Sequence, residues 1–188
     1  FVGTVDAPVR QMRQGSHGGH QDDRLVAGVG CVGSLDLRYR RDGARTTLTR
    51  SRCSTPWHFF PPAYLDDSGC AVTSLVNPSG GFVAGDHLSI HAALEEGAHV
   101  VMTTPSANRV YRSLGEEPRQ SVTLSVATVA VIEWFPEVTI PFAGSRFVQT
   151  MAVTLAKGAT ALIWDSLASG RVRIAVLVRL NGFVLCGE

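Results

Sequence analysis

Apolar and polar residues alternate along most of the chain from residue 26 onward, which is the pattern of half-buried β-strands. The segment CVGSLDLRY alternates in this way, RRDGAR supplies a turn, and TTLTRSRCS continues as a second strand. Asp42-Gly43 between two alternating segments is a strong signal for a β-hairpin. A proline-rich stretch, residues 56–62, then interrupts regular structure before CAVTSLVN resumes as a strand. The pattern therefore predicts a mainly β fold.

Three windows of the sequence superpose without gaps and indicate an internal repeat of roughly 30 residues. The windows are IHAALEEGAHVVMTT from Ile90, VTLSVATVAVIEWFP from Val122 and MAVTLAKGATALIWD from Met151. The fifth residue of each window is apolar, and these residues are Leu94, Val126 and Leu155. The ninth residue of each window is alanine, at Ala98, Ala130 and Ala159. Gly97 and Gly158 fill the eighth place of the outer windows, whereas the middle window has Val129 there.

Each window has the pattern of a strand, a tight turn and a second strand. Such a repeat favours stacked strand layers, as in a β-solenoid or sandwich. Chance similarity among strands rich in Val and Ala is the alternative. The segment SANRVYRSL, residues 106–114, is compatible with a turn or two of helix. The expected fold is mainly β, with stacked layers and one or two short helices.

Length and composition suit a folded chain with a sizeable core, because 45% of the 188 residues are hydrophobic and 18% are charged. Residues 1–24, which include QGSHGGHQDD, show no apolar period and are expected to form a flexible N-terminal leader. His17 and His20 in this leader could bind a metal ion loosely, although a solvated loop is the more ordinary interpretation. Residues 25–188 are expected to form a single β domain.

The charge balance narrows the range of partners. Seventeen basic and 16 acidic residues give a formal net charge of +1, so no field of one sign draws the chain to nucleic acid or to an anionic membrane. The sequence contains no apolar run of about 18 residues, so it predicts no membrane-spanning helix. No signal peptide is visible. Four scattered cysteines without a C-x-x-C pair argue against a zinc knuckle and suit a reducing compartment, so the cytoplasm is the expected location.

A glycine-rich step precedes one of the predicted strands. Gly80, Gly81 and Gly85 flank Phe82-Val83 before Asp86. This spacing lets the backbone adopt positive φ and turn sharply between two strands. Asp86 is expected to cap that turn by accepting backbone N–H bonds. A carboxylate that lines a polar passage is a second interpretation, and both can hold.

Residues 74–113, SLVNPSGGFVAGDHLSIHAALEEGAHVVMTTPSANRVYRS, resemble the signature block of the UreD (UreH) family of urease accessory proteins. That block combines N/H-x-x-GG, G-D, an amphipathic strand and TT-x-x-A-x-x-x-YRS. The segment GSLDLRYRRDGARTTLTRSRCSTPWHFFPP resembles the opening hairpin of the family, and VIEWFPEVTIPFAGSRF resembles its E-x-x-P-x-x-x-I-x-F-x-G-A/S-R stretch. The structural motif residues are Gly80, Gly81, Gly85, Tyr111, Arg112, Pro136, Arg146, Gly170 and Arg171.

The resemblance covers about residues 28–171. After Gly170-Arg171 the family continues with Gly-Glu and several more strands, whereas this chain has VRIAVLVRLNGFVLCGE. The C-terminal part of the domain is therefore expected to be incomplete. The resemblance implies a non-catalytic scaffold that helps to load nickel into apo-urease. It also implies a complex with UreF, with the GTPase UreG through UreF, and with apo-urease, and no tightly bound cofactor beyond Ni²⁺ in transit.

Nickel ions are bound by imidazole, carboxylate and thiolate ligands. The candidates within the matching motifs are Asp86, His87, Glu133 and Glu137. His87 and His91 share a face of one predicted strand, but a rise of about 3.3 Å per residue places them roughly 13 Å apart, too far for one ion to bridge. Widely spaced polar groups suit an ion in transit better than tight binding. An ordinary surface or core role remains the alternative for His87, His91 and His99.

Glu133 lies in the apolar segment VIEWFP and is expected to be the most buried acid. A buried acid needs a partner or a proton, and Arg146 and Arg109 are the motif arginines that could supply the partner. An Arg–Glu pair is favoured over a role in the ion path. Trp57, Phe59 and Phe60 beside the prolines are either anchors for a partner or core residues under a loop.

Enzyme signatures are missing from the sequence. It contains no G-x-S-x-G, P-loop, H-E-x-x-H or G-x-G-x-x-G motif. The alternative to the scaffold function is a stand-alone β-rich module that binds small polar ligands, or a hydrolase.

Overall fold

The computed structural model describes residues 30–168 and 177–187, and their regular structure consists of β-strands. The expected leader, residues 1–24, and the motif residues Gly170 and Arg171 lie outside this part. The strands are β1 (Val32–Asp42), β2 (Arg45–Cys53), β3 (His58–Phe59), β4 (Ala71–Val76), β5 (His87–Leu94), β6 (His99–Thr103), β7 (Asn108–Val110), β8 (Arg119–Val126), β9 (Val131–Phe135), β10 (Thr139–Pro141), β11 (Arg146–Leu155), β12 (Thr160–Ile163) and β13 (Leu177–Gly187).

The mainly β prediction is confirmed, but the expected helices are not found in the described residues. The segment proposed as helical, residues 106–114, instead contains the short strand β7, which pairs in parallel with β10. The carbonyl of Val138 accepts a hydrogen bond from the Asn108 amide (3.0 Å). Pairing with the neighbouring chain segment therefore prevails over the weak local helical preference. None of the described residues forms a helix long and apolar enough to span a membrane.

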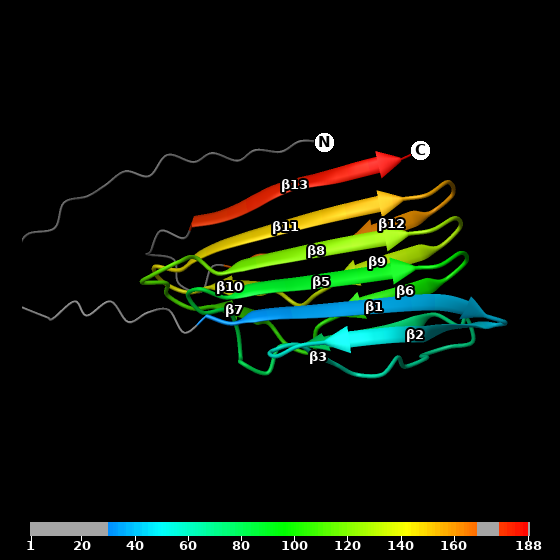
Figure 1. Cartoon of the computed structure of the whole chain (residues 1–188), viewed down its shortest axis with the longest axis horizontal. Helices are drawn as coiled ribbons and strands as arrows, with labels where there is room; N and C mark the ends of the chain where they lie inside the picture. The colour runs from blue at the N-terminus through cyan, green and yellow to red at the C-terminus, as the bar shows by residue number, and fades with distance from the viewer. Residues whose placement is uncertain (1–29, 169–176, 188) are drawn as a thin grey trace, which may run out of the picture.

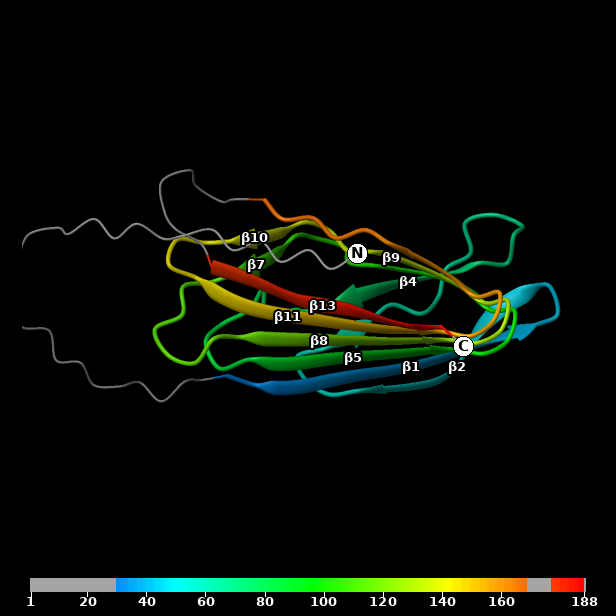
Figure 2. The same ribbon diagram turned by 90° about the horizontal axis from the view of Figure 1, so that it is seen from above.

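The strands wind into stacked coils. The larger sheet has the order β13-β11-β8-β5-β1-β2, and all its neighbours are parallel except β1 and β2. A second sheet has the order β12-β9-β6-β4-β3, and β7 and β10 form a short third face. The long strands lie in one layer and the second sheet faces them, as the two views show (Figure 1, Figure 2). Each coil thus passes from a long strand through a turn into the second sheet, which is the architecture of a β-solenoid.

The three sequence windows coincide with three successive coils. Their fifth places pair across the larger sheet, Leu94 with Val126 and Val126 with Leu155. On the second sheet, Val131 pairs with His99 on one side and with Thr160 on the other. The alignment of the windows is therefore the register of the strands, which confirms the repeat as structural and not a product of chance.

The first coil carries an insertion. Between β1 and β4 the chain forms the hairpin predicted at Asp42-Gly43, with Asp42 opposite Arg45 at its end. Of the three aromatic residues near the prolines, Trp57 is buried, Phe59 is half-buried and Phe60 is exposed. The aromatic segment therefore belongs partly to the core and partly to the surface.

The core fills the space between the two sheets. Alternate residues of each long strand point inward, so β5 buries Leu88, Ile90, Ala92 and Leu94 while its other side chains face outward. Inward residues of the second sheet, such as Met102 and Trp134, belong to the same buried cluster. One buried polar contact crosses this core, where the Tyr39 hydroxyl donates to Thr73 Oγ1 at 2.8 Å.

Candidate functional site

Asp86 is the buried carboxylate of the glycine-rich turn, with only 3% of its surface exposed. Its Oδ2 accepts a hydrogen bond from the Val83 amide (2.9 Å), and its Oδ1 accepts one from the Cys31 amide (3.0 Å). The Cys31 thiol also lies 3.5 Å from Oδ1. The predicted capping role of Asp86 is confirmed, and the carboxylate additionally fixes the segment that enters β1.

The sharp turn before Asp86 depends on glycine, as the spacing predicts. Gly80, Gly81 and Gly85 have φ values of 79°, 150° and 81°. The backbone of Phe82 pairs with β7, since the Phe82 amide donates to the Arg109 carbonyl (2.7 Å). A Cβ on Gly81 would lie 2.2 Å from that same carbonyl oxygen. The close approach of two backbones therefore requires glycine at position 81.

The turn also connects three coils at the end of the solenoid where β1, β5 and β8 begin. The His87 amide donates to the Cys31 carbonyl (2.8 Å), and the Arg119 amide donates to the Asp86 carbonyl (2.7 Å). The Gly85 amide donates to the Glu116 carbonyl (2.9 Å). Because Asp86 fixes this junction, it acts first as a structural residue.

Most of the other motif residues support the loops of the same region. The Tyr111 hydroxyl donates to the Gly80 carbonyl (3.3 Å), and its ring stacks edge-to-face on Phe142. Arg146 Nη2 donates to the Gly115 carbonyl (2.8 Å). The side chain of Arg112 packs beside Gly144, and Pro136 directly follows β9.

His87 points away from the core at the edge of this junction. Its Nε2 lies 3.1 Å from Glu116 Oε1, and both side chains are well exposed. Arg119, which is opposite His87 in the register, pairs with Glu117 at 3.2 Å. Ion pairs exposed in this way contribute little to stability.

Glu133 occupies a different place from the one expected. It lies on β9 between the buried Ile132 and Trp134, so strand alternation turns its side chain outward and leaves it half-buried. Its Oε1 lies 2.7 Å from His99 Nε2 on the neighbouring strand β6. The expected pairing with Arg146 or Arg109 is wrong, because Arg146 is bonded to a loop carbonyl and Arg109 is exposed. The most buried acid of the described chain is Asp86, not Glu133.

The four sequence-predicted nickel ligands do not come together. Asp86 and His87 lie at the start of β5 in the larger sheet, whereas Glu133 projects from the outer face of the second sheet. Glu137 is exposed in the segment after β9, where its amide donates to Thr104 Oγ1 (2.9 Å). Within the described residues, no group of three or more His, Cys, Asp or Glu side chains is placed so that it could hold a metal ion.

No sequence pattern identifies three further polar side chains with shifted pKa values, those of Cys31, Cys70 and Asp165. Burial raises the pKa of the Cys31 thiol, and the charge of Asp86 raises it further. Burial likewise raises the pKa of Cys70, with Glu133 and Asp66 as the negative neighbours. Shielding from water raises the pKa of Asp165, whose Oδ2 accepts a hydrogen bond from Gln149 Nε2 (2.6 Å). Isolated cysteines and a single Asp match no motif, and only the coiling of the chain gives them neighbours.

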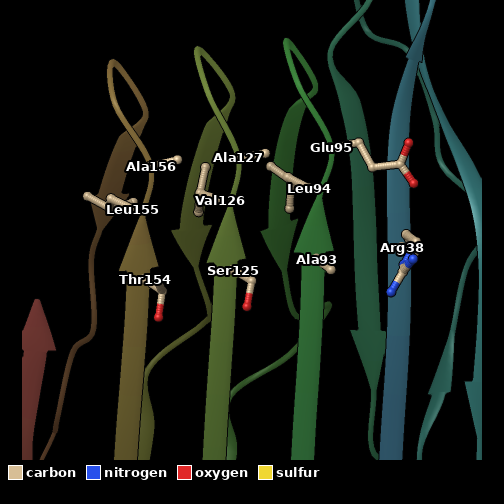
Figure 3. Close-up of a pocket in the computed structure, with 10 residues that line it drawn as sticks. All are labelled: Arg38, Ala93, Leu94, Glu95, Ser125, Val126, Ala127, Thr154, Leu155 and Ala156. Carbon is tan, nitrogen blue, oxygen red and sulfur yellow. The ribbon is translucent and has the colours of Figure 1, made fainter. Parts of the chain in front are cut away.

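The outer face of the larger sheet carries a shallow groove of about 440 Å³ at the ends of β5, β8 and β11. Figure 3 shows Ala93, Ser125 and Thr154 side by side on its floor, with Arg38 and Glu95 to one side. The other residues that line it are Leu94, Val126, Ala127, Leu155 and Ala156. The groove contains few polar side chains that could orient a small molecule, since Arg38, Glu95, Ser125 and Thr154 are the only ones in its lining.

Comparison with known proteins gives a consistent result. The family model described as UreD urease accessory protein matches residues 32–175. The urease accessory protein UreD of Delftia acidovorans is 38% identical over 138 residues, which cover 73% of this chain and 45% of the relative. The UreD of Marinobacter nauticus is 42% identical over 129 residues (67% and 43%), and that of Vibrio parahaemolyticus is 37% identical over 149 residues (79% and 53%). The chain spans about half the length of the curated relatives it matches.

Proposed function

The chain belongs to the UreD family of urease accessory proteins, and we propose that it serves as a non-catalytic scaffold in the assembly of the urease nickel centre. In this function it binds UreF, reaches the GTPase UreG through UreF, and contacts apo-urease in the cytoplasm. Ni²⁺ is the cargo of the complex and not a resident cofactor. The observation that carries the proposal is the family match across residues 32–175, within which the motif residues stabilise one end of the solenoid.

The exposed surface supports a scaffold function. Leu162 on β12 and Trp164 just after it are 52% and 63% exposed, and Leu167 is also exposed. Leu162 and Trp164 alternate with the half-buried Ile163, so they share the outer side of the second sheet. Grouped apolar side chains on a surface mark sites of protein association, and Trp is enriched among the residues that dominate binding energy. We assign this patch, Leu162 and Trp164, as the partner-binding surface.

The arrangement of polar groups supports passage of nickel over storage. Asp86 is engaged by backbone amides, and His87 and Glu133 each have one partner on a neighbouring coil. Separated groups of this kind hold an ion weakly, and weak binding is what entry and release require.

A co-expression pull-down tests the scaffold function. The full chain is produced with UreF and the urease structural subunits, and the complex is isolated through a tag on UreF. We expect Trp164→Ala to weaken recovery of the chain, because it removes the largest exposed side chain of the patch. Leu114→Ala is the matched control. Leu114 is at least as exposed as Trp164, but it lies in the loop between β7 and β8 and not on the second sheet. If the unmodified chain fails to co-purify with UreF or with urease, the proposed function is wrong.

A further inference from the structure

Arginine side chains gather on the outer face of the larger sheet, where β1 pairs with β2. Leu37 and Tyr39 on β1 are fully buried, and successive strand residues point to opposite faces. Arg38 and Arg40, which follow them, therefore point outward, and both are exposed. This is the face that carries the groove at the ends of β5, β8 and β11, because Arg38 also lines that groove.

The register of the hairpin adds two arginines from β2. Arg38 lies directly opposite Arg50, and Asp36 lies opposite Arg52. Opposite residues of an antiparallel pair project on the same face, so the exposed Arg50 and Arg52 join the arginines of β1. These four residues, Arg38, Arg40, Arg50 and Arg52, are called the arginine cluster below.

The neighbouring carboxylates do not neutralise the arginine cluster. Among the side chains that the structure describes, the ion pairs all lie elsewhere and include none of the four arginines. The acids beside the cluster are Asp36, opposite Arg52, and Glu95, whose amide donates to the backbone of β1 (2.9 Å). Asp42 lies at the end of the hairpin, opposite Arg45 and outside the cluster. Positive charge is therefore in local excess, although the formal net charge of the whole chain is only +1.

The cross-strand pair of Arg38 and Arg50 weakens the hairpin, because like charges directly opposite one another repel. A carboxylate placed between the two guanidinium groups turns this repulsion into attraction. The planar guanidinium group also binds a carboxylate through two parallel hydrogen bonds, which a lysine does not offer. The arginine cluster is therefore complementary in charge and in geometry to an acidic partner.

The groove beside the cluster provides room for a segment of polypeptide. Its volume is about 440 Å³, and its floor consists of the small side chains Ala93, Ser125 and Thr154 (Figure 3). In the register, Arg38 pairs with Ala93, Ala93 with Ser125, and Ser125 with Thr154. A segment laid along this row meets Arg38 at one end and only small side chains beyond it.

We propose that the arginine cluster and the adjoining groove form a docking surface for an acidic segment of a partner protein. Carboxylates of the segment bind the arginines, and its remaining residues rest on the floor of the groove. The inference goes beyond the proposed function and does not depend on it, since it rests on charge and geometry alone. The patch of Leu162 and Trp164 lies on the second sheet, so partners bound at the two surfaces do not compete for the same face.

A protein segment fits this surface better than nucleic acid does. Asp36 and Glu95 beside the arginines repel a phosphate backbone, whereas a polypeptide also carries N–H groups that donate to them. Single-stranded nucleic acid is held largely by aromatic side chains that stack on its bases, and the floor of the groove is made of Ala93, Ser125 and Thr154. The net charge of +1 provides no long-range field for a polyanion.

A labelled peptide of alternating Glu and Ser residues tests the surface with the purified 188-residue chain. Alternation places all the glutamates on one side of an extended segment. Fluorescence anisotropy measures the dissociation constant at several salt concentrations. We expect binding at low ionic strength that weakens as salt screens the charges, and no binding of a peptide of alternating Gln and Ser with the same length.

Variants locate the site on the surface. We expect the double variant Arg38→Gln/Arg50→Gln to weaken binding of the Glu-Ser peptide by at least about fivefold. Ser125→Trp, which fills the floor of the groove, should weaken it by a similar factor. The matched control Arg109→Gln/Arg119→Gln removes as many exposed arginines outside the cluster and should leave the dissociation constant unchanged, which separates local charge from net charge.

The proposal is overturned if the Glu-Ser peptide does not bind, or if Arg38→Gln/Arg50→Gln binds it as tightly as the control does. It is equally overturned if Ser125→Trp leaves binding unchanged, or if a single-stranded thymidine oligonucleotide of equal charge binds the cluster more tightly than the peptide. Circular dichroism verifies that each variant is folded, and Arg40→Gln/Arg52→Gln provides a second cluster variant should the first fold poorly.

Sedimentation velocity separates the proposal from a simpler role of the arginines. Charged side chains on an edge strand prevent its pairing with another sheet, and β2 is an edge strand of the larger sheet. A variant Arg38→Gln/Arg50→Gln that self-associates but keeps its affinity for the peptide would show that the arginines protect this edge, and would overturn the docking surface. The pull-down with UreF reports on the scaffold function separately, because the peptide experiment uses the chain without any urease component.

Discussion

Gly97 and Val129 occupy the same place in two successive turns of the solenoid, and both have a positive φ, of 66° and 58°. Gly158 holds that place in the third turn, with φ of 71°. Each turn is closed by the same backbone hydrogen bond, for example from the Ala130 amide to the Ala127 carbonyl (3.1 Å). A β-branched residue is strained in this region of φ, so the one departure from glycine in the repeat marks a strained turn.

Replacement of Val129 by glycine is expected to stabilise the protein. The left-handed conformation costs a non-glycine residue about 1–2 kcal/mol, and part of the gain is lost to the greater freedom of glycine in the unfolded chain. We expect Val129→Gly to raise the free energy of unfolding by about 1 kcal/mol, measured by urea denaturation. Ala127→Gly, in the same turn but without a positive φ, is the control and should lower it. A less stable Val129→Gly variant would show that the turn is not strained.

Loss of the Asp86 carboxylate is expected to destabilise the fold. Asp86→Ala leaves the Val83 and Cys31 amides without their acceptor, and because both hydrogen bonds are only partly buried, each costs less than the full penalty of about 1–3 kcal/mol for a buried unpaired donor. We expect a loss of about 2–4 kcal/mol in the free energy of unfolding. Asp67→Ala, at an exposed position, should change it little. If Asp86→Ala is as stable as Asp67→Ala but no longer supports urease activation, the carboxylate serves nickel passage and not the fold.

A side chain at position 81 is expected to break the turn before β5. The added Cβ of Gly81→Ala collides with the Arg109 carbonyl, which also accepts the hydrogen bond of the Phe82 amide. We expect a loss of at least about 3 kcal/mol or an insoluble protein, in the range of severe backbone substitutions. Gly115→Ala meets no atom within 4 Å and should be nearly neutral. A soluble Gly81→Ala variant with the melting temperature of Gly115→Ala would contradict the geometry of the turn.

The hydrogen bond between Tyr39 and Thr73 is expected to contribute to stability as a pair. Both residues are fully buried, so Tyr39→Phe leaves the Thr73 hydroxyl without its partner at a cost of about 1–3 kcal/mol. Thr73→Val added to Tyr39→Phe should recover part of that loss, since no buried polar atom is then unpaired. A double-mutant cycle by urea denaturation measures the coupling, and purely additive effects would contradict it.

The same pair gives the protein a predicted sensitivity to alkali. Burial raises the pKa of Tyr39 above its usual value of about 10, while the contact with Thr73 opposes the shift. The folded state therefore keeps a proton that the unfolded state releases, and stability falls as pH rises above about 10. Tyr39→Phe should lose stability less steeply over that range than the unmodified chain. Equal slopes for the two proteins would show that Tyr39 ionises equally in both states.

Local patterning was enough to predict the strands, the hairpin and the repeat. Alternation is a property of each strand, and the repeat windows align Leu94, Val126 and Leu155 because those residues share a register. The turn at Gly80, Gly81 and Gly85 was predictable for the same reason, since positive φ is a local demand. The short helix was wrong because residues 108–110 are held by a neighbouring coil, which local preference does not reveal.

The side-chain partners were harder to predict. Because Glu133 lies among apolar residues, the sequence pattern predicts it in the interior, but its place between Ile132 and Trp134 on β9 puts it on the outer face. Its contact with His99 depends on the stacking of β6 and β9, which belong to successive coils. Local sequence patterns do not reveal which strands are neighbours in a sheet, and these side-chain contacts depend on that strand order.

Nickel-dependent urease activation tests the scaffold function most directly. Apo-urease, UreF and UreG are co-expressed with and without this chain in cells that lack any other UreD protein, and urease activity is measured as nickel is supplied. The proposed function predicts activity that requires both nickel and the chain, with the chain recovered in complex with UreF. Equal activity with and without a folded, soluble chain would contradict it.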